Sequence, residues 1–438
     1  MHTILYDNAP SDWNEGLPIG NGVFGGMCWF RNAQYHTALN HYEVYYSICE
    51  RYRQKQQVQE RIEETKEPPC AKYVKAAQEN FRDYTKGPYR NYRKSIWPKA
   101  DEVKDTPMHR GVSHPTAGEV FLTLSDKLCN PEQYRLSLDI EDAKVRLFTQ
   151  REQKKLEIET CVLTSNDTLV HTVKQSEPGC VGEMSLIWPK RRNQQNFTCS
   201  FQQVDDRTFL CRASFFPWAE DRSIFPPFCF VTAIRLSDAK GELVYVGERE
   251  IRLKVKEDKK EYQIFACTVT QLQSSDPVTE VIRQLNVVES GFSDFLQKHG
   301  IYWNNFFEKS SVCLPDKFLE KLWYHSLYIL NCCSGKNGRR FEQACGLNGL
   351  WDVRQPTIWG SQWYWDVNIQ AAFWPVYTAN HLELAEVFNE GFLAYAEDAA
   401  RRAREFYHAP GYAIDYPFEF YNCIWPWCAQ FLWWYYEY

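Results

Sequence analysis

Apolar and polar residues alternate along much of the first 270 residues, which is the pattern of strands with one face in a core. At 251–256 three aliphatic residues alternate with three basic ones, and a charged turn then leads to a second apolar run. This pair predicts a hairpin with one solvent-exposed face, and many such strands in succession predict an antiparallel β-sandwich. Further strands are expected at 118–124, 144–149, 156–163, 168–174 and 228–236.

Residues 48–108 interrupt the strand pattern, because they are charged, poor in β-branched residues and broken by consecutive prolines at 68 and 69. We expect a helical insert on the surface of the sandwich. After about residue 272 the apolar period becomes helical, with one segment at 315–335 that ends at Gly335 and another at 380–406. Asn380 and Glu383 have the spacing of a capping box for the second helix.

Each helical segment shows an apolar stripe that is expected to face a core. In the first, the stripe comprises Phe318, Leu322, Ser326 and Ile329, with Leu319, Trp323 and Leu330 beside them. In the second, it comprises Leu384, Phe388, Phe392, Tyr395 and Ala399. The last residues, "IWPWCAQFLWWYYEY", are apolar on most sides of a helix, and Trp427, Phe431 and Trp434 recur at core spacing. We therefore expect the natural chain to continue past Tyr438 or to be a truncated gene product.

A chain of 438 residues is expected to form two or more domains. The net charge of −6, spread over both signs, argues against a nucleic-acid partner and favours a neutral substrate. The N-terminus lacks the features of a secretion signal and no run is apolar enough to span a membrane, so we expect a cytoplasmic protein. The sequons at Asn166 and Asn196 are then accidental.

The 16 cysteines are scattered without zinc spacing, which favours reduced, buried thiols over a disulfide framework. The residues suggest no metal site and no cofactor. His36 and His41 are expected at a sheet surface or between domains. The glycines of "GLPIGNGVFGG" lack the spacing of a phosphate loop and are assigned to tight turns between strands.

The stretch at 358–384 surrounds a short polar string at 366–368 with four tryptophans, Trp359, Trp363, Trp365 and Trp374. Sugars combine flat C–H faces with hydroxyl rims. Indole rings match the faces, and Asp, Asn and Gln side chains hydrogen-bond the hydroxyls in fixed directions. The cluster therefore predicts a sugar site.

Four segments resemble glycoside hydrolase family 95, whose members include α-L-fucosidases, and they occur in the family's order. The first is "DWNEGLPIGNGVFGGMCWF" followed by "ALNHYEVYYS", and the second and third are "TAGEVFLTL" and "YRLSLDIEDAKV". The fourth is "GLNGLWDVRQPTIWGSQWYWDVNIQAAFWPVYTANHLEL". The resemblance implies an N-terminal β-supersandwich at 1–271, a helical linker at 272–315 and part of an (α/α)6 catalytic barrel at 316–438.

The resemblance also implies inverting exo-hydrolysis of α-L-fucosyl or closely related α-L-galactosyl linkages in oligosaccharides. Two asparagines of the family motif, which help to hold the attacking water, fall on Asp366 and Asn368, and a matching glutamine falls on Gln370. The general acid and the partner base are expected beyond Tyr438. Asp366 departs from the pattern, so it is either a base, a ligand for another sugar hydroxyl, or a helix cap.

Trp359 and Trp365 are expected in the pocket wall, and Asp415 in a polar loop over the barrel mouth.

Three interpretations of the function follow. The first is an inverting glycosidase with Asp366 and Asn368 as catalytic residues. The second is a disaccharide phosphorylase of the same architecture, in which phosphate replaces water. The third is a non-catalytic carbohydrate-binding fragment. The expected partner is an oligosaccharide, and the sequence does not define the oligomeric state.

Overall fold

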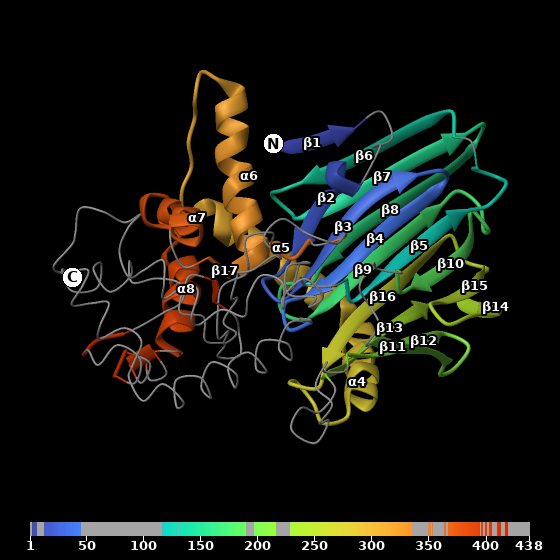
Figure 1. Cartoon of the computed structure of the whole chain (residues 1–438). Coiled ribbons are helices and arrows are strands. Elements are labelled where there is room, and N and C mark those ends of the chain that lie inside the picture. The colour runs from blue at the N-terminus through green and yellow to red at the C-terminus, as the bar shows by residue number, and fades with distance from the viewer. Residues whose placement is uncertain are drawn as a thin grey trace, which may run out of the picture.

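The structure is a computed structural model in which a strand-rich part precedes a helical part (Figure 1). The helical insert expected at 48–108 and the aromatic residues Trp427, Phe431 and Trp434 lie outside the described residues. The structure describes residues 2–6, 13–44, 116–129, 131–189, 197–215, 228–334, 349–351, 353, 363–364, 367–394, 396, 399–400, 403–404, 410–412 and 417–418.

Two antiparallel sheets form the sandwich that the alternating pattern predicts. The first has nine strands in the order β1-β6-β7-β8-β9-β16-β13-β12-β11, and the second has seven in the order β14-β15-β10-β5-β4-β3-β2. The nine strands are β1 (Thr3–Tyr6), β6 (Gln133–Asp139), β7 (Lys144–Arg151), β8 (Lys154–Val162), β9 (Thr168–Gln175), β11 (Phe197–Gln203), β12 (Thr208–Phe215), β13 (Phe228–Ser237) and β16 (Glu261–Thr270). The seven are β2 (Leu17–Gly20), β3 (Phe24–Arg31), β4 (Gln34–His41), β5 (Gly118–Leu124), β10 (Val181–Ile187), β14 (Lys240–Val246) and β15 (Glu250–Lys256).

The expected strands at 118–124, 144–149, 156–163, 168–174 and 228–236 are confirmed as β5, β7, β8, β9 and β13. The hairpin expected from 251–256 is wrong, because β15 and β16 lie in different sheets. β15 pairs with β14 and β10, whereas β16 pairs with β9 and β13. The charged turn therefore crosses from one sheet to the other.

Burial explains why these two strands separate. β15 buries Ile251, Leu253 and Val255 and turns its basic residues toward water, as the alternation predicts. β16 is buried on both faces over most of its length, so it needs a central position with cover on each side. Helix α4 (Pro277–Ser290) supplies the outer cover by packing on β13 and β16 (Figure 1).

The helical part continues with α5 (Phe292–Glu308), α6 (Lys317–Ser334), α7 (Val367–Thr378) and α8 (Leu382–Ala394). Two short strands, β17 (Trp363–Tyr364) and β18 (Pro417–Phe418), pair with each other, and a 3-10 helix lies at Trp13–Glu15. Trp303 of α5 is fully buried and contacts Phe306 and Phe307 of the same helix and Tyr328 of α6. This aromatic cluster joins the first two helices after α4.

The apolar stripe expected on α6 is wrong. The helix buries Tyr324, Leu327 and Tyr328, whereas Phe318 is 73% exposed and Leu322 is 51% exposed. α6 is apolar around most of its circumference, so the periodic pattern alone does not select the packed face. The selected face has a polar anchor, because the Tyr328 hydroxyl donates to the Pro18 carbonyl of β2 at 2.8 Å.

The two histidines expected at a surface or between domains lie within the seven-stranded sheet. His41 is fully buried at the end of β4, so a sheet-surface position is wrong for this residue. His36 of the same strand stacks on Trp29 with ring centroids 4.8 Å apart. Burial of its imidazole lowers the pKa of His36 to about 4.

The Gly-rich segment around β2 joins the sandwich to the helices. Gly22 has φ +90° and lies in a tight turn, as expected, and its N–H donates to the Cys332 carbonyl of α6 at 2.8 Å. Gly20 serves a different purpose, because a Cβ at this position would lie 2.6 Å from the same carbonyl oxygen. The Trp351 indole N–H also donates to the Ile19 carbonyl at 3.0 Å. A close approach of backbones thus explains Gly20.

Replacement of Gly20 by alanine is expected to lower the free energy of unfolding by about 1–3 kcal/mol, because the added methyl group forces β2 and α6 apart. Urea unfolding followed by far-UV circular dichroism measures this. Gly300→Ala in α5 is the matched control, since a Cβ there meets nothing within 4 Å. Alanine also favours a helix by about 0.8–1.0 kcal/mol over glycine. Equal destabilisation by both substitutions would contradict the close packing at Gly20.

Candidate active site

Helix α7 contains two of the sequence-predicted site residues, Asn368 and Gln370, and the structure describes both as half-buried. The helix spans Val367–Thr378, with Pro375 inside it. The other four site residues, Trp359, Trp365, Asp366 and Asp415, lie outside the described residues. Asp366 directly precedes the first residue of α7 in the sequence.

The packed face of α7 comprises Ile369, Phe373 and Val376, which are buried at helical spacing. Asn368 and Gln370 flank this face on opposite sides, because residues two positions apart on a helix do not face the same way. The two side chains therefore leave α7 in different directions, and they can contact different parts of one ligand.

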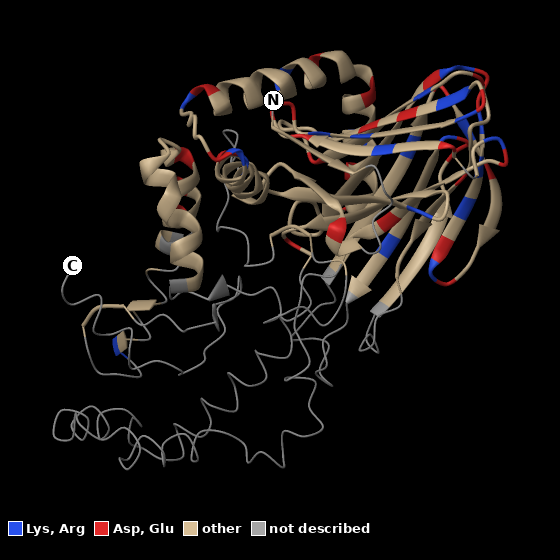
Figure 2. Cartoon of the chain, turned by 90° about the horizontal axis from the view of Figure 1, so that it is seen from above, with Lys and Arg blue, Asp and Glu red and all other residues tan. Residues whose placement is uncertain are grey.

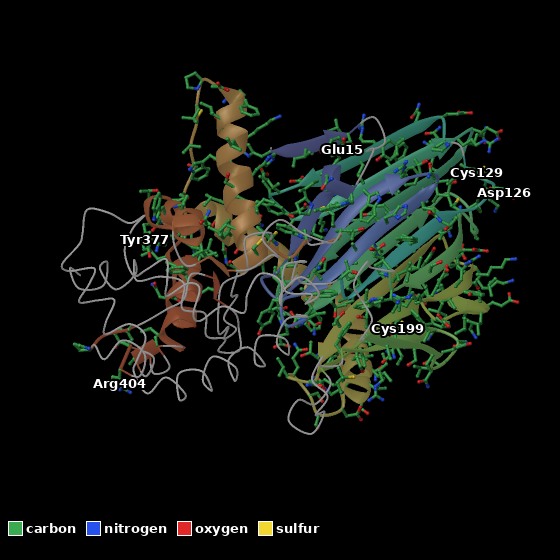
Figure 3. All side chains as sticks on the ribbon, in the orientation of Figure 1. Glu15, Asp126, Cys129, Cys199, Tyr377 and Arg404 are labelled. Atoms are coloured by element: carbon green, nitrogen blue, oxygen red, sulfur yellow. The ribbon has the colours of Figure 1, made fainter. Side chains whose placement is uncertain are left out.

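The flank that contains Gln370 also contains two exposed aromatic residues, since positions 370, 374 and 377 follow each other at helical spacing. Trp374, which the sequence places in the tryptophan cluster, is 59% exposed. Tyr377 is also exposed and lies on the side of α7 away from the sandwich (Figure 3). An amide beside two open aromatic rings is a surface that can hydrogen-bond hydroxyls and stack on C–H faces.

A pair of short strands brings two distant segments together beside α7. Trp363 of β17 pairs with Phe418 of β18, and Tyr364 pairs with Pro417. β17 also contacts α7. Trp365 and Asp366 directly follow β17 in the sequence, and Asp415 lies two residues before β18. The pairing places β17, which precedes α7, beside β18, which the sequence pattern does not reveal.

The far end of α7 is fixed to the end of α5 by a polar junction. Asn380 has φ +58° and its side-chain amide donates to the Lys309 carbonyl at 3.1 Å, so its expected role as the cap of α8 is wrong. The residue instead ends α7, because asparagine tolerates the left-handed conformation that terminates helices. His381 is fully buried and stacks on Phe306 with ring centroids 4.1 Å apart.

The charges of this junction are mutually satisfied. Glu383 lies 3.2 Å from His381 Nδ1 and 2.7 Å from Lys309 Nζ, and Ser310 lies 3.3 Å from His381 Nε2. Burial alone would raise the pKa of Glu383, but the hydrogen bonds from His381 and Lys309 lower it to about 2. The contacts from Ser310 to His381 and from His381 to Glu383 resemble a triad of nucleophile, base and acid. The imidazole is buried and stacked on Phe306, and Glu383 is paired with Lys309, so we interpret this group as a structural junction.

The charged residues, cysteines and helices of the described part show no further active site. Acidic and basic residues intermingle over the strands of the sandwich (Figure 2). Within the described ranges, no group of three or more His, Cys, Asp or Glu side chains converges as a metal site. The described cysteines form no disulfide with one another, and burial raises the pKa of Cys28 and Cys332 to about 12. Of the helices in the described part, none is both long and apolar enough to cross a membrane.

Two protein-family comparisons match separate parts of the chain. Residues 4–213 match the N-terminal domain of glycosyl hydrolase family 65, and residues 302–438 match the catalytic domain of glycosyl hydrolase family 95. A search of curated protein sequences finds no match. Both matched models describe glycoside hydrolase domains, and the second is the family that the sequence motifs resemble.

One solved structure supports the fold. A protein described as a kojibiose phosphorylase from the human microbiome aligns with a TM-score of 0.53 at 11% identity, over 92% of this chain and 50% of that one. A bacterial glucoamylase bound to acarbose aligns with a TM-score of 0.37 at 10% identity, over 60% of this chain and 41% of that one. The chain therefore spans about half the length of the first structure. The fold is a β-sandwich followed by part of a helical barrel.

Proposed function

We propose that the protein is an inverting glycoside hydrolase that removes α-L-fucosyl, or closely related α-L-galactosyl, residues from oligosaccharides. The observation that supports this most strongly is the family 95 catalytic match over residues 302–438, which includes the whole of α7. The intermingled acidic and basic residues of the sandwich suit a neutral substrate. We further propose the domain division 1–271, 272–315 and 316–438, and a cytoplasmic location remains a prediction.

In the proposed mechanism, Asp366 and Asn368 hold the attacking water. Inverting glycosidases need carboxyl functions about 6.5–9.5 Å apart, so that water fits between the base and the sugar. Asp366 accepts a proton from that water as its oxygen attacks the anomeric carbon, and the Asn368 amide orients it by a hydrogen bond. The glycosidic C–O bond breaks at the same time, and a general acid that these motifs do not identify protonates the leaving oxygen. Trp359 and Trp365 bury the apolar face of the sugar, while Gln370 and Asp415 hydrogen-bond its hydroxyls.

The orientation of α7 supports this assignment of roles. Asn368 lies in the first turn of the helix, next to the segment that follows β17. The junction at His381 and Glu383 fixes the other end of the same helix. Because a helix is stiff over this length, an anchor at one end restricts where the first turn can point.

Proton NMR tests the proposal, because it identifies the anomeric form of the first sugar released from an α-L-fucosyl oligosaccharide. Inversion predicts β-L-fucose as the initial product, at the same rate with and without phosphate. Fucose 1-phosphate, formed only when phosphate is added, would instead establish the phosphorylase that the family 65 match allows. Binding of the oligosaccharide without release of either product would identify a carbohydrate-binding module. An α-anomer as first product would contradict the proposal.

A further inference from the structure

Two cysteines lie side by side on β11 and β12, at one edge of the nine-stranded sheet. Cys199 of β11 is opposite Ala213, and Cys211 of β12 is opposite Phe201. The two cysteines are therefore diagonal neighbours on one face of the strand pair, since alternate residues of a strand point the same way. Both pack in the core between the two sheets, and the Cys211 thiol donates a hydrogen bond to the Cys199 sulfur.

The two thiols differ in their surroundings. Cys211 is 2% exposed, whereas Cys199 is half-buried at the β11 edge of the sandwich and can be reached by small solutes (Figure 3). The hydrogen bond from Cys211 and the nearby Arg249 guanidinium lower the pKa of Cys199, although burial and the Glu248 carboxylate oppose this shift. The same hydrogen bond and burial raise the pKa of Cys211. Cys199 is therefore the thiol of this pair that ionises first.

The lowered pKa distinguishes Cys199 from the other cysteines of the described part. Where the pKa of another described cysteine is shifted, burial or a neighbouring thiol raises it. The thiolate is the nucleophilic form of cysteine, and reactive cysteines lie in partly exposed, electropositive surroundings. Redox-sensing cysteines combine such a thiolate with a second cysteine nearby. Cys199 and Cys211 together meet both conditions.

A hydrogen bond from Cys199 also connects the two sheets. The Cys199 S–H donates to the Glu248 carbonyl at 2.9 Å. Glu248 lies in the turn between β14 and β15, so this bond joins the edge of the nine-stranded sheet to the seven-stranded sheet. The Trp188 N–H holds the same turn by donating to the Arg249 carbonyl at 2.8 Å. Oxidation of Cys199 to a disulfide removes the S–H donor, and the turn then loses one of these bonds.

We propose that Cys199 and Cys211 form a redox-sensitive pair, in which hydrogen peroxide oxidises Cys199 and Cys211 then closes a disulfide between β11 and β12. The Cys199 thiolate attacks one peroxide oxygen, so an S–O bond forms as the O–O bond breaks, and the departing hydroxide takes up a proton to become water. Cys211 then loses its proton and attacks the Cys199 sulfur, so the S–S bond forms as the S–O bond breaks and a second water leaves. Two thiols are oxidised and one peroxide is reduced to two waters.

The edge position of β11 allows this bond to form. Diagonal neighbours in an antiparallel pair have Cα atoms about 7–8 Å apart, and a disulfide needs about 4.4–6.8 Å, so the strands must approach by about an ångström. β11 ends its sheet and has β12 as its ladder partner in the described part, so it can shift without disturbing a second ladder. A disulfide that requires such a shift is more easily reduced than a relaxed one, which makes the modification reversible.

Peptide mapping by mass spectrometry after treatment of the folded chain with hydrogen peroxide tests the proposal. In the wild type we expect the loss of two free thiols and a Cys199–Cys211 disulfide, which dithiothreitol reverses. In Cys211→Ser we expect a sulfenic acid at Cys199, which dimedone traps. Cys199→Ser is expected to leave Cys211 reduced, because Cys211 is buried and lacks its more reactive neighbour.

Cys129→Ser is the matched control. Cys129 is also half-buried, its S–H donates to the Asp126 carbonyl at 3.6 Å, and an Arg151 guanidinium nitrogen lies 3.8 Å from its sulfur. This cysteine thus resembles Cys199 in exposure and in its neighbouring arginine. The control variant is expected to form the disulfide between Cys199 and Cys211 as fast as the wild type does.

Hydrogen exchange gives a second readout on the wild type, which requires no variant to fold. Oxidation is expected to speed exchange of the Trp188 amide by about two- to tenfold, as the loss of one weak hydrogen bond in the turn would do. Reduction is expected to restore the original rate.

Three outcomes contradict the redox pair. The first is a folded wild-type chain in which peroxide leaves Cys199 and Cys211 reduced. The second is Cys199→Ser that loses two thiols as fast as the wild type, since the disulfide then lies elsewhere. The third is a Cys199–Cys211 disulfide that leaves exchange at Trp188 unchanged, which removes the proposed effect on the turn.

Discussion

Asp366→Ala is expected to lower the turnover of an α-L-fucoside by about 10²–10⁴-fold, which is the usual contribution of a positioned general acid or base. The side chain is the proposed proton acceptor for the attacking water, and alanine can neither accept the proton nor orient the water. Release of fucose under substrate saturation measures the effect on kcat. Asp366→Asn tests the same role, because it keeps the shape and hydrogen bonding but removes the basic carboxylate.

The alternative role of Asp366, as the cap of α7, predicts a different result. Loss of a helix cap costs about 0.5–2 kcal/mol of stability and leaves the chemistry intact. Thermal unfolding of the same variant therefore separates the two roles. Thr378→Ala, at the exposed other end of α7, is the control for general disturbance of this helix. Unchanged turnover in Asp366→Ala, with a lower unfolding temperature, would reduce Asp366 to a cap.

Trp303→Ala is expected to destabilise the protein by about 3–5 kcal/mol, the range for removal of a fully buried large aromatic side chain. The indole is completely buried and contacts rings on both α5 and α6, at centroid distances of 5.7 Å to Phe306 and 5.2 Å to Tyr328. Alanine would leave a cavity between the two helices. The surrounding strands and helices restrict how far it can collapse.

Urea unfolding followed by circular dichroism measures this loss. Trp374→Ala is the matched control, because the Trp374 side chain is 59% exposed and its removal leaves no buried cavity. We expect a change within about 0.5 kcal/mol for the control, as for most surface substitutions. If the two substitutions destabilise the protein equally, then the aromatic cluster around Trp303 is not what joins α5 to α6.

Strand periodicity predicted the sandwich well, because each strand with one wet face alternates visibly in the sequence. The pairing of the strands was harder to predict from the sequence. β15 and β16 are joined by a short charged turn, which is typical of a hairpin, yet they lie in different sheets. The signal that distinguishes them is the nearly continuous burial of β16, which requires cover on both faces. That cover comes from α4, and its position is a tertiary feature.

The helical part shows the same limit. The sequence correctly predicted a helix at α6 and at α8, but it chose the wrong buried face for α6, because that helix is apolar on most sides. Asn380 was interpreted as the start of α8, whereas its left-handed conformation ends α7. Capping residues at the boundary between two helices suit either one, so the sequence alone does not decide.

The candidate site was found from residue chemistry and family motifs, and the structure adds its arrangement. The pairing of β17 with β18 places Trp363 and Tyr364, shortly before α7, beside Pro417 and Phe418. Helix geometry separates Asn368 from Gln370, although the two lie in one motif. Neither relation is visible in the sequence, because the first joins residues about 50 positions apart and the second depends on the helical turn.

The most direct test of the account is calorimetric titration of the chain with an α-L-fucosyl oligosaccharide, using the same oligosaccharide without fucose as the reference ligand. We predict saturable binding of the fucosylated ligand at one site. We also predict an affinity at least about tenfold lower in Asn368→Ala, which corresponds to about 1.4 kcal/mol. Equal affinity for both ligands, or equal affinity in the wild type and Asn368→Ala, would contradict a fucose site at the start of α7.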